Sequence, residues 1–305
     1  MYLRISITDR CNMRCLYCFP KGYKKLPKKE LLSFEEIIEL IAVLKDFGLR
    51  KIRITGGEPL LRKGVCRFAE KLFSMGIPVY ISTNGALLER FAHSLRESGI
   101  TRVNVSVDSL REDRFGFITK TPLLPQVLRG IETAQKAGLE VKVNSVLMKN
   151  INDDEIFDFL DYFLPRKIRL RFIEFMPFPH TRNQFEKLFV PYEEILNRIS
   201  ERYSVSYAGT DGVAKEFKIK EFEATVGFIS PVSKPFCRNC DRLRLTASGK
   251  LKVCLHSGWE FDVKEILRHG NKGRLKEAVK EALELKAQIS SPRWKAERSM
   301  VEIGG

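Results

Sequence analysis

The stretch Leu3–Pro20, LRISITDRCNMRCLYCFP, joins an alternating strand pattern directly to three cysteines. Apolar and polar side chains alternate over Leu3–Thr8, as expected for a β-strand with one buried face. Cys11, Cys15 and Cys18 follow, separated by three and then two residues. If the strand belongs to a parallel barrel, these cysteines lie at its carboxyl end, where the active sites of such folds collect.

The same unit of strand, turn and amphipathic helix recurs through the first 176 residues. Ser33 and Glu36 predict a capping box at the start of one helix, and Gly48 predicts its end. Six such units favour a full or partial parallel βα barrel, with a doubly wound open sheet as the alternative. The predicted strands are Leu3–Thr8, Lys51–Thr55, Val79–Thr83, Arg102–Val107, Val141–Leu147 and Ile168–Phe175.

The two faces of these strands differ in polarity. One face is apolar, with residues such as Leu3, Ile5 and Val105, and the other carries polar and basic residues. A polar lumen suits a charged ligand better than a dry aliphatic core, although a solvated face on an open sheet is the alternative. The polar set is Arg4, Ser6, Thr8, Arg53, Thr55, Asn104, Ser106, Asp108, Lys142 and Asn144.

Composition narrows the class of protein. The 305 residues are 44% hydrophobic and 30% charged, which excludes a disordered chain. No apolar run approaches the roughly 18 residues of a membrane span, and the N-terminus lacks the pattern of a signal peptide. We therefore expect a cytoplasmic protein without membrane association. Its formal net charge of +15 indicates a polyanionic partner such as a nucleotide, a nucleic acid or an acidic protein.

Six of the seven cysteines form two groups of three. The second group, Cys237, Cys240 and Cys254, lies in PFCRNCDRLRLTASGKLKVCL. Three thiolates without a fourth protein ligand suit an iron–sulfur cubane with one open iron better than zinc, although a zinc ribbon is the alternative for the second group. The seventh, Cys66, has the helical spacing of a small buried hydrophobe.

The loop CNMRCLYC resembles the signature of the radical S-adenosylmethionine (SAM) superfamily, and TGGEP at 55–59 resembles its glycine-rich SAM element. This resemblance implies that the first three cysteines hold a [4Fe-4S] cluster whose open iron binds SAM. The reduced cluster of such enzymes cleaves SAM to a 5′-deoxyadenosyl radical, which abstracts hydrogen from the substrate.

Both cysteine spacings together resemble the molybdenum cofactor biosynthesis A family of GTP 3′,8-cyclases. The resemblance extends through YLRISITDRCNMRC, KIRITGGEPLLR, STNG, RVNVSVDS, VKVNSV, INDDEI, RFIEFMP, CDRLRL and the terminal glycines. It implies a second [4Fe-4S] cluster, on Cys237, Cys240 and Cys254, whose open iron takes the guanine. It also implies conversion of GTP to (8S)-3′,8-cyclo-7,8-dihydroguanosine 5′-triphosphate, the first step of molybdopterin synthesis.

Site residues follow from the same resemblance. It assigns SAM contacts to Tyr17, Gly57, Ser106 and Met176. It assigns GTP contacts to Arg4, Arg53, Thr83, Lys142, Arg242 and Arg244, and a role in the radical step to the tail residues Gly304 and Gly305. Arginine and lysine are suited to a triphosphate through forked donors and a compact charge.

The resemblance also predicts organisation and partners. We expect a barrel core over 1–176 and a C-terminal domain over 177–305 that carries the second cluster and closes the barrel mouth. Expected partners are cyclic pyranopterin monophosphate synthase as the next enzyme, a ferredoxin or flavodoxin as reductant, and a second copy in a homodimer. The alternatives are a radical SAM peptide-modifying enzyme with an auxiliary cluster and a basic, zinc-containing nucleic-acid-binding protein. The second is disfavoured because no aromatic-basic stripe is present.

Overall fold

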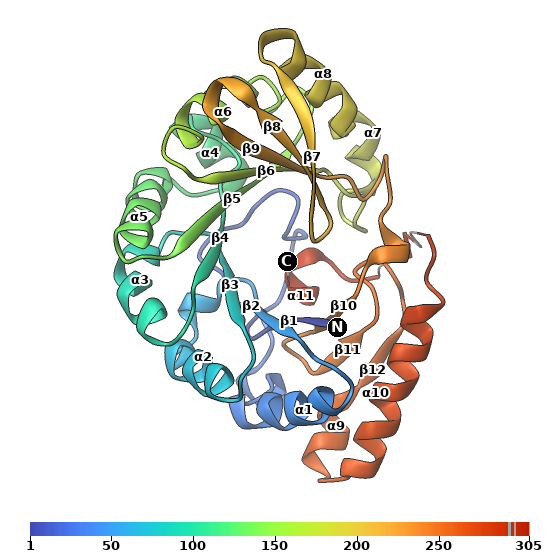
Figure 1. Ribbon diagram of the computed structural model, residues 1–305. Coiled ribbons are helices and arrows are strands. Elements are labelled where there is room, and N and C mark those ends of the chain that lie inside the picture. The colour runs from blue at the N-terminus through green and yellow to red at the C-terminus, as the bar shows by residue number, and fades with distance from the viewer. Residues whose placement is uncertain (292–293, 296, 305) are drawn as a thin grey trace.

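All six predicted strands are present and lie side by side in one curved sheet, as the computed structural model shows (Figure 1). The structure describes residues 1–291, 294–295 and 297–304. Within these ranges, twelve strands form a single sheet in the order β12-β11-β10-β1-β2-β3-β4-β5-β6-β9-β8-β7. The strands are β1 (Tyr2–Ser6), β2 (Lys51–Thr55), β3 (Val79–Thr83), β4 (Arg102–Ser106), β5 (Glu140–Leu147), β6 (Arg169–Glu174), β7 (Val205–Asp211), β8 (Ala214–Ile219), β9 (Ala224–Ile229), β10 (Arg242–Leu245), β11 (Lys250–Lys252) and β12 (Glu260–Asp262).

Helices cover the outer face of this sheet (Figure 1). Helix α1 begins as predicted: the Ser33 hydroxyl accepts a hydrogen bond from the Glu36 amide, and the Glu36 carboxylate accepts one from the Ser33 amide. The apolar strand residues are fully buried against the helices, which confirms the predicted faces. The helices are α1 (Phe34–Asp46), α2 (Val65–Ser74), α3 (Leu88–Glu97), α4 (Glu112–Thr119), α5 (Leu124–Lys136), α6 (Ile156–Phe163), α7 (Phe185–Leu188), α8 (Tyr192–Arg202), α9 (Val263–Arg268), α10 (Lys272–Ala287) and α11 (Met300–Ile303).

The second half of the chain extends the same sheet at both edges. Strand β10 pairs in parallel with β1, and β9 pairs in parallel with β6, so β10, β1 to β6 and β9 form the parallel body. Two antiparallel strands complete each edge, and the strand order among the described residues joins no edge of the sheet to the other. The barrel is therefore partial. The predicted division after residue 176 stays a prediction.

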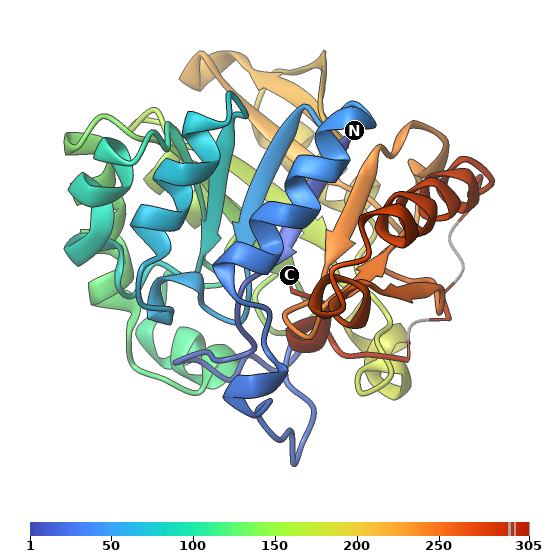
Figure 2. The same cartoon turned by 90° about the horizontal axis from the view of Figure 1, so that it is seen from below.

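The parallel strands point toward the cysteine loop. In Figure 2 the segment that follows β1 lies at the carboxyl ends of the strands, and the β7–β8 hairpin lies at the opposite end. Helix α11, near the end of the described chain, lies inside the curve of the sheet (Figure 1). No helix of the described part of the chain has both the length and the apolar character needed to cross a membrane.

Candidate active site

One cavity of about 370 Å³ fills the inside of the curved sheet. Both groups of three cysteines line it, although they are more than 200 residues apart in the sequence. The other predicted site residues that line it are Arg4, Tyr17, Arg53, Gly57, Thr83, Ser106, Lys142, Met176, Arg242 and Arg244. Gly304 lies beside the cavity, whereas Gly305 falls outside the described residues.

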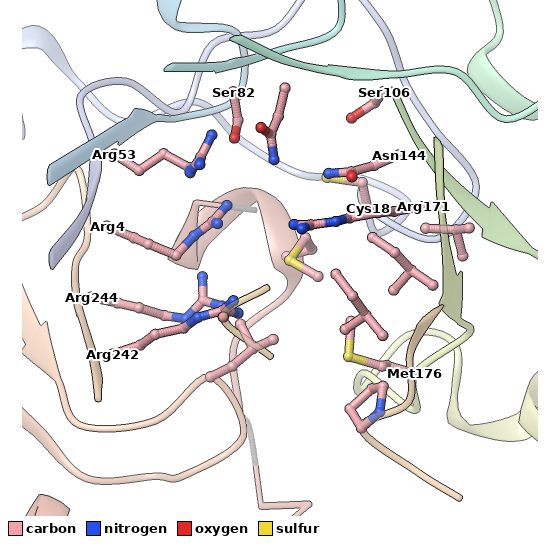
Figure 3. Close-up of a pocket in the computed structure, with 18 of the residues that line it drawn as sticks. Arg4, Cys18, Arg53, Ser82, Ser106, Asn144, Arg171, Met176, Arg242 and Arg244 are labelled. Carbon is pink, nitrogen blue, oxygen red and sulfur yellow. The ribbon is translucent and has the colours of Figure 1, made fainter. Parts of the chain in front are cut away.

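Strand register places three arginines in one row across the lumen. Arg4 of β1 is level with Arg53 of β2 on one side and with Arg244 of β10 on the other. Figure 3 shows these side chains and Arg242 converging on the cavity from one wall. The Arg53 Nε donates to the Tyr2 hydroxyl at 2.6 Å. Sequence alternation placed Arg4 and Arg53 on the lumen face, and parallel pairing adds Arg244 to them.

The burial and the crowding of these cations perturb the pKa values in the cavity. Burial, together with neighbouring arginines, lowers the pKa of Arg4 to about 9 and that of Arg244 to about 10. Burial alone would raise the pKa of the Tyr2 phenol, but Arg53, Arg4 and Arg242 outweigh it and bring the pKa to about 7. The lowered pKa of Tyr2 therefore reports a concentrated positive potential inside the cavity. A polyanionic ligand would relieve that potential, and a polyphosphate matches the forked guanidinium donors.

The first cysteine group is surrounded by groups suited to a cluster and an adjacent ligand. The Cys11 sulfur accepts from the Met13 amide at 3.4 Å and from the Asn84 side-chain amide at 3.5 Å. Burial raises the pKa of the Cys15 and Cys18 thiols. Such buried thiols become thiolates readily only when a metal takes their charge.

The glycine-rich loop after β2 packs tightly against the segment after β1. The Gly57 amide donates to the Thr8 carbonyl at 2.6 Å, and a Cβ on Gly57 would lie 2.5 Å from the Arg10 carbonyl oxygen. Only glycine fits this approach without movement of the backbone. The loop thereby presents main-chain groups to the cavity, beside Tyr17, whose hydroxyl donates to the Asp108 carboxylate at 2.7 Å.

The second cysteine group lies at the edge of β10 and β11. The Cys254 sulfur accepts from the His256 amide at 3.4 Å, and the Lys286 ammonium, from α10, donates to the Cys240 sulfur at 3.3 Å. Burial raises the pKa of Cys237, and the two neighbouring thiols raise it further. Hydrogen bonds to sulfur are among the contacts that stabilise and tune iron–sulfur clusters.

All seven cysteines are free thiols. No three His, Cys, Asp or Glu side chains of the described residues are arranged to hold a metal ion directly. The inference that each cysteine group binds an iron–sulfur cluster therefore depends on two observations: both groups line one cavity, and hydrogen-bond donors face their sulfur atoms. Cys66, on α2, lies outside this cavity and packs, partly buried, against the core.

The structure qualifies one predicted contact and adds others. The Thr83 side chain follows the outward face of β3, and its hydroxyl donates to the buried Glu58 carboxylate at 2.8 Å. On this strand Ser82 faces the lumen (Figure 3). Sequence reasoning did not select Tyr2, Lys51 or Arg171, which also line the cavity. Tyr2 and Lys51 lie two residues before Arg4 and Arg53 on the same strands, so strand alternation could have placed them on the lumen face. The alternation of β6 was too irregular to place Arg171.

The fold and the cysteine loop define the class of protein. Residues 5–163 match the model of the radical SAM superfamily, and residues 168–291 match that of the molybdenum cofactor synthesis C family. The chain therefore belongs to the radical SAM superfamily. Among solved structures, Streptococcus suis SuiB bound to S-adenosylmethionine superimposes with a TM-score of 0.64 at 14% identity, covering 91% of this chain and 67% of that one. This likeness concerns the fold alone.

Curated relatives place the chain within that superfamily. The GTP 3′,8-cyclase of Thermodesulfovibrio yellowstonii is 45% identical, over 100% of this chain and 97% of that protein. Those of Pelotomaculum thermopropionicum and Geobacter sulfurreducens are each 40% identical, over 100% of this chain and 97% and 96% of theirs. Over its whole length the chain thus belongs to the GTP 3′,8-cyclase family.

Proposed function

We propose that the chain converts GTP to (8S)-3′,8-cyclo-7,8-dihydroguanosine 5′-triphosphate, in the first step of molybdenum cofactor biosynthesis. One observation carries this proposal: a single cavity is lined at once by both cysteine groups and by the row Arg53, Arg4 and Arg244. A nucleotide held by these cations would lie between the two cysteine groups. The full-length identity to GTP 3′,8-cyclases supports GTP as that nucleotide.

The two cysteine groups would each hold one [4Fe-4S] cluster, and the first would also present SAM. When bound, the first cluster and SAM would supply the hydrogen-abstracting radical chemistry that links ribose C3′ to guanine C8. The protein orients the nucleotide, matches its charge and keeps water from the reacting atoms. Tyr17, Gly57, Ser106 and Met176 would bind SAM.

The residues proposed to bind GTP are Arg4, Arg53, Thr83, Lys142, Arg242 and Arg244. Thr83 lines the cavity, and because its hydroxyl donates to Glu58, its contribution to GTP binding would be weaker than that of the cationic side chains. The tail residue Gly304 would help to place the nucleotide, since its carbonyl already accepts a hydrogen bond from Arg244 at 3.1 Å.

Anaerobic reconstitution with iron and sulfide tests the proposal directly. The loaded protein should bind about eight irons for two cubanes, and it should cleave SAM with release of the cyclised nucleotide only when GTP is present. Stoichiometric zinc after anaerobic isolation, or SAM cleavage coupled to a peptide rather than to GTP, would contradict it.

Partners beyond GTP are part of the same proposal. The cyclised product would pass to cyclic pyranopterin monophosphate synthase, and a ferredoxin or flavodoxin would reduce the first cluster. A homodimer and a cytoplasmic location are likewise proposed. Pull-down with each candidate protein tests the two partners, sedimentation of the purified chain tests the homodimer, and fractionation of cells tests the location.

A further inference from the structure

A hairpin tip reaches the lumen from the end opposite the first cysteine group. Strands β7 and β8 turn at Gly212 and Val213, and the tip points toward the centre of the sheet's curve (Figure 1). Asp211, the last residue of β7, lines the main cavity. One of its carboxylate oxygens accepts from the Lys142 ammonium, from Arg171 at 2.6 Å and from Arg169 at 3.4 Å.

The carboxylate and its cations differ in how firmly they are held. The side chains of Lys142 and Arg171 are 2% and 10% exposed, whereas that of Asp211 is 37% exposed. Arg171 keeps a second partner, Glu216 of β8, at 2.8 Å. The other carboxylate near the Lys142 ammonium is Glu140, at 3.8 Å. Asp211 is therefore more exposed than the two cations that it neutralises, and its departure would leave Glu140, at 3.8 Å, as the carboxylate next to the Lys142 ammonium.

The position of the hairpin leaves room for such a departure. Strand β7 is the terminal strand of the sheet and is largely exposed. A second cavity of about 270 Å³ lies at the tip and is lined by Gly212 and Val213. It shares Tyr2, Lys51, Gly212 and Arg242 with the main cavity. The tip thus stands between the lumen and an opening at the amino ends of the strands.

We propose that Asp211 is a displaceable substitute for phosphate on Lys142 and Arg171. In the free enzyme its carboxylate neutralises these buried cations, and a bound polyphosphate takes its place while the hairpin tip withdraws. The inference rests on the proposed function for the identity of the polyphosphate as GTP. A carboxylate that must be displaced weakens binding of the phosphate chain, and it favours release of a triphosphate product by returning to the cations.

The variant Asp211→Asn tests this inference in the anaerobically reconstituted enzyme. Equilibrium dialysis should show GTP and inorganic tripolyphosphate binding about tenfold more tightly than to the unchanged enzyme, because an amide competes weakly for cations. Guanosine carries no phosphate and should bind equally to both. Glu221→Gln is the matched control: it removes the same charge just after β8, away from the cavity lining, and should leave all three affinities unchanged.

Hydrogen exchange of the unchanged enzyme supplies a readout that needs no variant. Amides of residues 205–219 should exchange faster once GTP or tripolyphosphate is bound. The inference is overturned if Asp211→Asn binds GTP and tripolyphosphate no more tightly than the unchanged enzyme, or if guanosine gains affinity equally. It is also overturned if Glu221→Gln shows the same gain, or if the hairpin exchanges more slowly when ligand is bound. If tripolyphosphate behaves as expected but GTP does not bind, the proposed function fails while the role of Asp211 stands.

Discussion

Replacing Gly304 by alanine tests whether the tail belongs to the active site. Gly304 has a φ of +85°, and a Cβ there would lie 2.4 Å from the Ser6 Cβ and 3.1 Å from the Thr55 hydroxyl. Such a backbone conformation costs a residue with a side chain about 1–3 kcal/mol, and the overlap with Ser6 adds to this. The strain alone would shift the tail roughly 5- to 150-fold toward an undocked state. Undocking would also break the hydrogen bond from Arg244 to the Gly304 carbonyl.

Turnover to the cyclised nucleotide, measured by chromatography and mass spectrometry, should fall at least about fivefold in Gly304→Ala, while iron content is unchanged. Two double variants distinguish the steric clash with Ser6 from the backbone strain at residue 304. Adding Ser6→Gly removes the atoms that would clash and should restore part of the activity, whereas adding Ser6→Ala keeps the Cβ and should restore none. Turnover equal to that of the unchanged enzyme would refute the role of the tail, and equal rescue by both changes would refute the steric argument.

Three further predictions concern the clusters and the cations. Replacing the three cysteines of the first group by alanine should leave about four irons and no SAM cleavage. Cys66→Ala should change neither the iron content nor the rate of SAM cleavage. Arg244→Ala should weaken GTP binding roughly 10- to 100-fold, as expected for charge-assisted hydrogen bonds, while SAM binding persists; equal loss of both affinities would indicate a folding defect. A bound triphosphate should raise the pKa of Tyr2 from about 7, so GTP affinity should fall as pH rises through 7, and Tyr2→Phe should abolish that dependence in dialysis at several pH values.

Much of the barrel could be predicted because its signals are local. Alternation along β1, β2, β4 and β5 separates a buried face from a polar face within single strands. The capping box at Ser33 likewise depends on residues three positions apart. The cysteine loop follows β1 directly, so its place at the carboxyl end of the sheet follows from strand direction alone.

The arrangement of the second half could not be predicted in the same way. Its strands join opposite edges of the sheet, and nothing local indicates that β10 lies beside β1 while β9 lies beside β6. The row of arginines depends on that pairing, because Arg244 becomes level with Arg4 only through it. Asp211 is a similar case: in the sequence it reads as one residue of a polar turn, and its three cations come from two strands far from it in the chain.

The charge of the cavity connects these observations. Buried like charges oppose folding unless something neutralises them, and Arg4 and Arg244 show the opposition in their lowered pKa values. Two side chains partly neutralise this positive charge. The Tyr2 phenol, beside Arg53, has a pKa lowered toward ionisation, and the Asp211 carboxylate forms an ion pair with Lys142. Both forms of neutralisation are reversible, because the Tyr2 phenolate can regain its proton and the proposed withdrawal of the hairpin removes Asp211. A site that must bind and release a triphosphate needs counter-ions that leave on demand, and these two side chains meet that need.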